Sequence, residues 1–468
     1  MQRPQKLKRL VLSGCVNLKK LPDLSTATNL EFIDVDGCKN LLEIPSYIQY
    51  LRNLYYLNLC GCEKLQNVPS LVQLESLKFL SLSYCYNLKI PPEIPEGIQN
   101  LRLNRCGLKA IAAFEKLQEL LQLNKWYECL RFPHNLQKLS LNGCENLDSL
   151  PSLVDLKSLT LLDLSCCSNL TKLPNIPRGV QVLRLGNSGI EKLPSSISCL
   201  SSLVELELKE WRNLAETAIV KIPGDIFSLS SLLVLCLNNC KRLRVLPELP
   251  KQLRQLQALN CTSLETAKKS SSFAVVQEPN KYTYQFNYCN CFNLKQTSHC
   301  NIIADSLLRI KGIDKATEAL EYIVGFPGSE VPEQFECKSE GSSISIKLPP
   351  HYNNSKDLGF AFYNGNQKDD NDKDFDRAIC CYLEEKGEKY ILESDHLFIW
   401  YTTESYCDNG NEVSFKFNCK DPSGVKLEIK NCGVHMIWIE QKESDPKQTV
   451  IAVPGSQSRF SGANIANN

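Results

Sequence analysis

The chain has 468 residues, which is enough for two or three ordinary domains or for one long repeat array with a companion domain. Its 53 basic and 52 acidic residues leave a formal net charge of +1, so neither nucleic acid nor an anionic membrane is expected as a partner. We find no apolar run of secretory or membrane-spanning length, and we expect a cytoplasmic protein, with a nuclear location left open.

The first half of the chain repeats one spacing of leucines about every 23 residues. The copy formed by Leu54, Leu57, Leu59, Cys62 and Leu65 defines the pattern LxxLxLxxCxxL. Twelve copies begin near Leu7, Leu30, Leu54, Leu77, Ile98, Gln118, Leu136, Leu159, Val180, Leu203, Leu232 and Leu253. The pattern resembles the leucine-rich repeat, which implies an α/β solenoid of short parallel strands over residues 1–265.

A cysteine recurs at the ninth position of most copies, where the chain turns inward after the strand. A small thiol fits that corner and donates weakly to backbone carbonyls. We expect free thiols that form a ladder with one rung per coil. A metal site is not expected, since such thiols do not converge on one point and the Cys60/Cys62 and Cys289/Cys291 pairs lack CxxC spacing.

Side chains alternate along a strand, so the residues beside the core leucines point away from the core. Stacked coils curve, and their strands line the concave side, which is the usual binding surface of such arrays. Aromatic and arginine side chains there are typical anchors of protein interfaces. The predicted protein-binding residues are Tyr56, Asn58, Phe79, Arg102, Asn104, Lys138, Asp163, Arg184, Glu205, Glu207 and Lys209.

The leucine period ends near residue 265, and TAKKSSS at 266–272 has the composition of a linker. We therefore predict a linker over 266–285, a second domain over 286–445 and a disordered tail over 446–468. A helix is expected within 301–322. Short β-rich runs joined by Asn, Asp and Gly predict an antiparallel sandwich, with strands at 342–350, 358–364, 378–385, 396–401, 412–417 and 425–440.

Several motifs of this second half occur in a specific order: NCFNLKQ, FPGSEVPEQF, GSSISIKLPP, LGFAFYN, SDHLFIWY and KNCGVHMIWIE. The set resembles the post-repeat (C-JID) domain of plant intracellular immune receptors of the Toll/interleukin-receptor, nucleotide-binding, leucine-rich-repeat class. The resemblance covers residues 1 to about 440 and implies a jelly-roll-like sandwich. In that family the repeats and this domain together grip a pathogen effector.

Seven positions match the family's motifs: Pro327, Gly328, Val331, Pro332, Phe335, Cys432 and Gly433. We expect these residues to hold the fold rather than to contact ligand, because proline and glycine fix backbone angles and Phe335 packs. One departure is Gln334, where the family has tryptophan, which puts a packing contact of this loop in doubt.

The resemblance predicts the ligand-recognition portion of an immune receptor, with an effector or a host protein as partner and a full-length receptor as a second partner for signalling. The alternative is a repeat adaptor or ubiquitin-ligase substrate receptor. We find no GxxxxGK[ST] loop and no HExxH or GxSxG motif, so we expect no cofactor and no enzymatic activity. Because the chain begins where the repeats begin, we expect a receptor fragment or a truncated product without the signalling domains.

Overall fold

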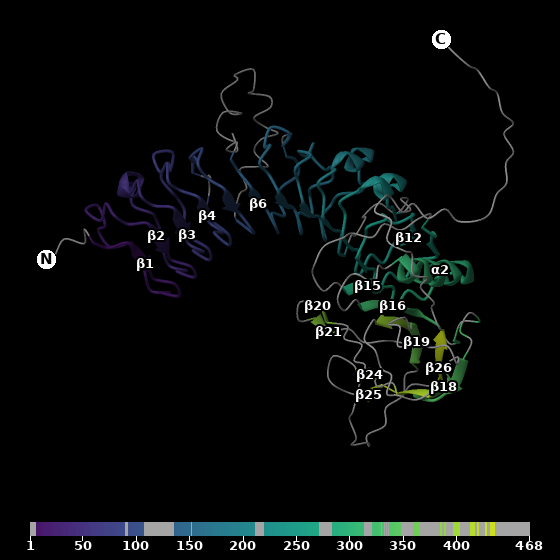
Figure 1. The fold of residues 1–468 in the computed structure, drawn as a ribbon. Helices are drawn as coiled ribbons and strands as arrows, with labels where there is room; N and C mark the ends of the chain where they lie inside the picture. The colour runs from purple at the N-terminus through teal and green to yellow at the C-terminus, as the bar shows by residue number, and fades with distance from the viewer. Residues whose placement is uncertain are drawn as a thin grey trace, which may run out of the picture.

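A computed structural model describes residues 6–88, 92–106, 135–150, 152–210, 220–270, 283–312, 321–328, 330–331, 333, 335, 337–347, 359–364, 384–385, 388–389, 396–402, 412–416, 419–420, 426–427 and 431–435. Figure 1 shows the first part of the chain as an arc of coils, purple at the N-terminus and teal at the far end, with the C-terminal strands packed at the teal end.

One parallel sheet runs along the arc, and each coil contributes one short strand to it. Its strands are β1 (Arg9–Val11), β2 (Phe32–Asp34), β3 (Tyr56–Asn58), β4 (Phe79–Ser81), β5 (Asn100–Arg102), β6 (Lys138–Ser140), β7 (Leu161–Asp163), β8 (Val182–Arg184), β9 (Glu205–Glu207), β11 (Val234–Cys236), β13 (Gln255–Gln257) and β15 (Thr283–Asn287). Each strand pairs in parallel with the next in this order. The predicted solenoid with a parallel sheet is therefore confirmed.

The core of the arc is a continuous column of apolar side chains. The alternation of side chains along each strand places them on the face of the sheet opposite the concave surface. In β3, Leu57 is fully buried, whereas Tyr56 and Asn58 on either side of it are half-buried. The same residue of the next strand, Leu80, is fully buried and pairs with Leu57. Removing this apolar surface from water, coil after coil, stabilises the array at roughly 25 cal/mol per Å².

In eight coils the cysteine donates a hydrogen bond to the coil before it. The Cys85 Sγ lies 3.2 Å from the Leu59 carbonyl oxygen, and the Cys167 Sγ lies 3.2 Å from that of Leu141. The same bond is made by Cys38, Cys62, Cys144, Cys240, Cys261 and Cys291. Burial raises the pKa of Cys85 to about 12, so this thiol keeps its proton. The predicted ladder of structural thiols is confirmed.

The residue directly before the cysteine position has a left-handed backbone and turns the chain into the core. Glycine occupies this corner in Gly14, Gly37, Gly61 and Gly143, with φ between 67° and 73°. Asparagine, which tolerates this conformation, occupies it in Asn187, Asn239, Asn260 and Asn290. Four other residues also adopt it: Tyr84, Arg105, Cys166 and Glu210.

Short elements form the outer side of the arc. They are the 3-10 helices η1 (Ser46–Tyr50), η2 (Ser195–Cys199) and η3 (Gly224–Ser228), together with a small parallel sheet of β10 (Val220–Lys221), β12 (Leu243–Leu246) and β14 (Thr266–Ala267). Each of the three helices buries one isoleucine and follows a proline, whose fixed φ suits the start of a helix.

The sheet of the arc continues directly into the C-terminal region. β15 pairs in parallel with β16 (Glu321–Pro327), which pairs antiparallel with β22 (His396–Thr402). Antiparallel pairing then continues through β19 (Gly359–Asn364), β26 (Asn431–His435) and β17 (Cys337–Glu340). Three antiparallel pairs lie outside this sheet: β18 (Ser343–Lys347) with β23 (Glu412–Lys416), β20 (Glu384–Glu385) with β21 (Glu388–Lys389), and β24 (Cys419–Lys420) with β25 (Lys426–Leu427). The jelly-roll topology itself stays a prediction.

One expectation about the solenoid needs correction. The predicted linker over 266–285 is not a linker in the residues described, because Thr266–Ala267 is β14 and 283–285 begin β15. The chain instead completes a further coil in which Phe286 and Tyr288 replace the core leucines and Cys291 takes the cysteine position. The copy predicted near Gln118 lies outside the described residues.

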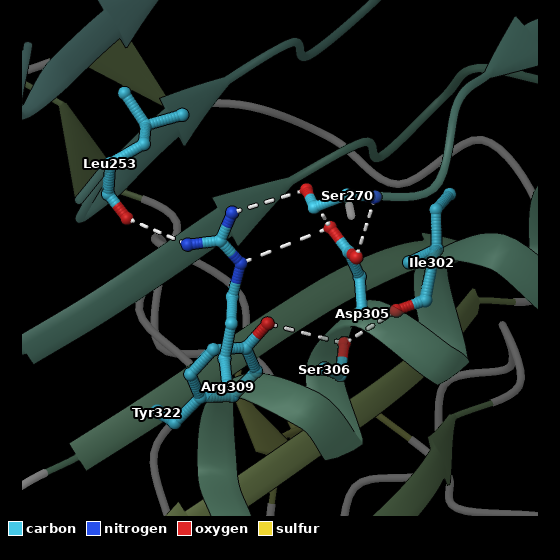
Figure 2. A network of polar contacts seen from close by, with 7 residues as sticks. All are labelled: Leu253, Ser270, Ile302, Asp305, Ser306, Arg309 and Tyr322. Atoms are coloured by element: carbon cyan, nitrogen blue, oxygen red, sulfur yellow. Dashed lines mark hydrogen bonds and ion pairs between the residues drawn. The ribbon is translucent and has the colours of Figure 1, made fainter. Parts of the chain in front are cut away.

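A helix, α2 (Gln296–Gly312), follows the last coil; it overlaps the predicted region 301–322 but begins five residues earlier, and a polar cluster binds it to the solenoid (Figure 2). Arg309, which is only 1% exposed, donates to the Leu253 carbonyl oxygen over 3.1 Å and lies 3.9 Å from the Asp305 carboxylate. Asp305 accepts hydrogen bonds from the backbone N–H and the hydroxyl of Ser270 at 2.9 and 2.7 Å. The Tyr322 hydroxyl of β16 joins the cluster through Ser306 at 3.2 Å.

Candidate protein-binding surface

The candidate site is the concave face of the arc, formed by the strand residues that flank the buried leucines. All eleven predicted concave residues lie on β3–β9 or within two residues of a strand's end: Tyr56, Asn58, Phe79, Arg102, Asn104, Lys138, Asp163, Arg184, Glu205, Glu207 and Lys209. Their positions follow from the register of the parallel sheet, which places equivalent residues of successive coils side by side. Whether they bind a partner stays a prediction.

An aromatic ladder crosses the first coils of this face. The ring centroids of Phe32 and Tyr56 are 4.2 Å apart with an interplanar angle of 6°, and those of Tyr56 and Phe79 are 4.3 Å apart at 7°. Each outer ring is covered by a guanidinium group, Arg9 at 4.1 Å from the Phe32 centroid and Arg102 at 5.3 Å from the Phe79 centroid. We call these five residues the aromatic ladder. Its stacking and cation–π contacts fix the side chains before any partner arrives.

Carboxylates flank the ladder at its N-terminal end. The Asp34 carboxylate accepts hydrogen bonds from the Asn58 side-chain amide at 3.0 Å and from the Asp36 backbone N–H at 3.1 Å. Burial raises the pKa of the Tyr56 hydroxyl, and the nearby Asp34 charge raises it further. Tyr56 therefore stays protonated and presents a hydroxyl, not a phenolate, to a partner.

The centre of the concave face is a hydrogen-bonded polar network. The Ser140 hydroxyl donates to the Asn104 side-chain oxygen at 2.6 Å and also lies 3.2 Å from the Asp163 carboxylate. Asp163 is 9% exposed and also accepts the backbone N–H of Ser165 at 3.0 Å. These contacts hold the side chains of Asn104 and Asp163 in place. Because Asp163 is almost fully buried, it adds negative charge to the surface but little accessible area.

An ion-pair cluster follows on β8 and β9. The Arg184 guanidinium is 3.1 Å from the Glu205 carboxylate and 3.4 Å from that of Glu207. All three side chains are 31% exposed or less, so the cluster is held more firmly than a fully exposed surface pair. One arginine shared by two glutamates leaves excess negative charge at this place.

The last third of the arc carries a ladder of amides that leads into the C-terminal sheet. The Asn290 side-chain amide donates to Asn260 at 2.8 Å, and that of Asn260 donates to Asn239 at 3.1 Å. The Asn290 backbone N–H donates to Nε2 of the fully buried His396 at 2.9 Å. His396 is thus a hydrogen-bond acceptor in the core of the junction.

The structure places most of the family-motif residues in packing positions. Phe335 and Cys432 are buried, and Pro327 lies at the end of β16 opposite His396. A Cβ added to Gly433 would meet Cγ1 of Val331 at 2.5 Å, which explains why glycine is needed there. Gly328 is partly exposed, and Pro332 lies outside the described residues. These contacts support the expectation that the motif holds the fold.

Sequence reasoning missed Arg9 and Phe32, which complete the aromatic ladder. The signal was present, because Arg9, Phe32, Tyr56 and Phe79 all directly precede the first core residue of the LxL pair in their copies.

Neither a cluster of metal-ligating side chains nor a membrane-spanning helix is found among the described residues. Nowhere among them do three His, Cys, Asp or Glu side chains gather in a way that would hold a metal ion. In the same part of the chain, no helix has the length and apolar character needed to cross a bilayer.

The fold and this surface define a leucine-rich-repeat protein whose solenoid is fused to a β-rich C-terminal region. Residues 326–443 match the C-JID domain family. Three Arabidopsis thaliana relatives are similar to nearly the whole chain: Disease resistance protein RPS4B (28% identity over 94% of this chain and 37% of that protein), Disease resistance protein RPS6 (29%, 92% and 39%) and Disease resistance protein RPP2B (31%, 98% and 44%). The chain spans about two fifths of the length of these relatives. Over 92–98% of its length the chain is similar to these plant disease resistance proteins, and its C-terminal region matches the C-JID domain family.

Proposed function

We propose that this chain is the ligand-recognition portion of a plant intracellular immune receptor and that its concave face binds a pathogen effector or a host protein. The observation that carries the proposal is the aromatic ladder, because stacked aromatic side chains held by arginine are the residue types that dominate protein interfaces. The disease resistance role of the relatives supports an immune function.

The same proposal includes action by binding rather than by catalysis, with the protein in the cytoplasm or the nucleus. Preorganisation supports a binding role, since side chains already fixed by their neighbours lose little entropy when a partner docks. A fluorescent fusion of the chain in leaf cells tests the location. Fluorescence confined to the secretory pathway would contradict it.

The binding proposal is tested with a matched pair of variants. Tyr56→Ala,Phe79→Ala removes the centre of the ladder, whereas Phe227→Ala removes an aromatic side chain that is 50% exposed on the outer helix η3. Each tagged protein is expressed in leaves challenged with pathogen, and captured proteins are quantified by mass spectrometry. We expect a partner that binds the wild type and Phe227→Ala and is lost from the ladder variant. Equal capture by all three proteins would contradict a concave binding face.

A further inference from the structure

The concave face changes its charge halfway along the arc. We compare the charged residues of two groups of three neighbouring strands. In each coil we count the residue before the strand, the strand itself, and the residues that follow it up to and including the left-handed corner. In β4–β6 these positions hold Lys78, Arg102, Arg105 and Lys138, and they hold no acidic residue. Among the described residues, none of these four cations lies in an ion pair. We call this group the basic segment.

The next three strands carry the opposite charge. The equivalent positions of β7–β9 hold four acidic residues, Asp163, Glu205, Glu207 and Glu210, against the two cations Arg184 and Lys209. Arg184 is shared between two of the glutamates, as described above. We call this group the acidic segment. Strands in a sheet are about 4.8 Å apart, so the centres of the two segments lie roughly 14 Å from each other, farther than the screening length of about 8 Å at physiological ionic strength.

The aromatic ladder overlaps the basic segment at Phe79 and Arg102 and presents ring edges, not ring faces. Both faces of Tyr56 are covered by its aromatic neighbours, and the outer rings are covered by Arg9 and Arg102. Ring edges carry the positive end of the aromatic quadrupole and attract carboxylate or carbonyl oxygens. No ring face is left for a nucleobase to stack on, although stacking is the main sequence-tolerant contact in single-stranded nucleic-acid binding.

We infer that the concave face binds a protein surface on which an acidic patch and a basic patch lie side by side, the acidic patch against β4–β6 and the basic patch against β7–β9. This inference rests on the proposed function and specifies the partner's chemistry. An extended polyanion fits less well, because its phosphates would meet the carboxylates of the acidic segment as soon as they left the basic one. Complementary patches also orient a protein partner along the arc.

The basic segment is tested with fluorescein-labelled octaglutamate, and fluorescence anisotropy gives its affinity for the full chain. Arg102→Glu,Lys138→Glu reverses two exposed charges in the segment, and Arg52→Glu,Lys251→Glu makes the same charge change at two exposed residues elsewhere. We expect the first variant to bind octaglutamate about tenfold more weakly and the control to stay within about twofold of wild type. Circular dichroism verifies folding, and Lys138→Glu alone repeats the test with a single surface change.

The acidic segment is tested in the same way with octalysine. Glu205→Gln,Glu207→Gln should weaken octalysine binding and should not weaken octaglutamate binding. The inference is overturned if octaglutamate does not bind at low ionic strength, or if it binds the Arg102→Glu,Lys138→Glu variant as tightly as wild type. It is also overturned if octathymidylate binds the same segment more tightly than octaglutamate, which would indicate a nucleic-acid surface.

This inference and the proposed function can fail separately. Capture of a partner could depend on Tyr56 and Phe79 while octaglutamate binding does not depend on the basic segment. In that case the concave binding face is supported and the charge assignment is wrong. If the peptides map to the two segments but no captured protein depends on the ladder, the charge assignment stands and the proposed function falls.

Discussion

The substitution Arg309→Met tests the cluster that joins helix α2 to the solenoid. Methionine keeps most of the apolar stem, so the change removes mainly the guanidinium group. That group donates to the Leu253 carbonyl oxygen at 3.1 Å, lies 3.5 Å from the Ser270 hydroxyl and stands 4.7 Å from the Phe286 ring centroid. Its removal leaves the Asp305 carboxylate, which is 13% exposed, without its cation.

The expected cost follows from what stays behind. Removing one partner of a buried ion pair typically costs about 3–5 kcal/mol, since the remaining charge stays buried and unpaired. Asp305→Asn should cost a similar amount, because it leaves Arg309, which is 1% exposed, buried without a counter-charge. In the double variant no unpaired carboxylate remains. We therefore expect the double variant to cost about 1–3 kcal/mol less than the sum of the two single changes.

Urea denaturation of the wild type and the three variants measures the free energy of unfolding. Repeat arrays can unfold in parts, so hydrogen exchange of peptides from β13, β15 and α2 should be followed in parallel. The destabilisation should concentrate in those peptides and spare β2–β4. A cost below about 1 kcal/mol for Arg309→Met, or strictly additive effects, would refute the view that this ion pair holds the junction.

Three further predictions concern the coils and helix α2. Gly61→Ala should destabilise the chain by about 1–2 kcal/mol, because the left-handed backbone disfavours a Cβ and this Cβ would lie 3.2 Å from Gly37 backbone atoms. The matched control is Gly224→Ala, whose added Cβ would have no atom within 4 Å. Equal melting temperatures of the two variants would contradict the argument that the corner needs glycine. Iodoacetamide should label the exposed Cys199 in the native protein and Cys85 only after denaturation, since burial raises the pKa of Cys85 to about 12; early labelling of Cys85 would show that the thiol ladder opens. Burial lowers the pKa of His299, so the unfolded chain binds the proton more readily and the stability of the fold decreases as the pH drops below about 6.5. Between about pH 7.5 and 5.5, the melting temperature of His299→Gln should therefore fall less than that of wild type. Identical pH profiles of the two proteins would contradict this.

The solenoid was predictable because each coil is decided locally. Alternation in a three-residue strand places one leucine inside and its two neighbours outside, so the sequence alone identifies Leu57 as core and Tyr56 and Asn58 as surface. The cysteine and the corner residue before it add independent evidence for the same register. The concave residues predicted from this pattern lie on strands β3–β9 or two residues after them, and their role in binding stays a prediction.

The last coil was missed because it departs from the leucine template in both composition and length. Phe286 and Tyr288 fill the core positions, and 30 positions separate Leu256 from Phe286, more than the usual repeat. Larger aromatic side chains occupy the core where the regular coils end. The Cys291 thiol still donates the hydrogen bond typical of the thiol ladder, here to the Ala258 carbonyl oxygen. This cysteine is the feature of the repeat pattern that the last coil retains.

Contacts between coils were only partly predictable. The aromatic ladder follows from aligning the copies, since equivalent residues of neighbouring coils lie side by side in a parallel sheet. The Arg309 cluster does not follow from any pattern, because its members come from separate segments whose packing depends on tertiary structure. A buried arginine with a backbone carbonyl as acceptor leaves no periodic signal in the sequence.

One sheet runs without a break from the solenoid into the C-terminal strands. This continuity determines which experiments can separate the contributions of the two parts to ligand recognition. A solenoid needs a cap at its end, and an uncovered strand edge invites aggregation. Here β16 covers the edge of β15, and the buried His396 of β22 accepts a hydrogen bond from the last corner. Truncation near residue 268 would remove β15, Ser270 and α2, and would thereby expose the edge of β13 and part of the core. Loss of binding by such a fragment would report unfolding as readily as recognition, so substitutions on exposed positions of the intact chain are the informative comparison.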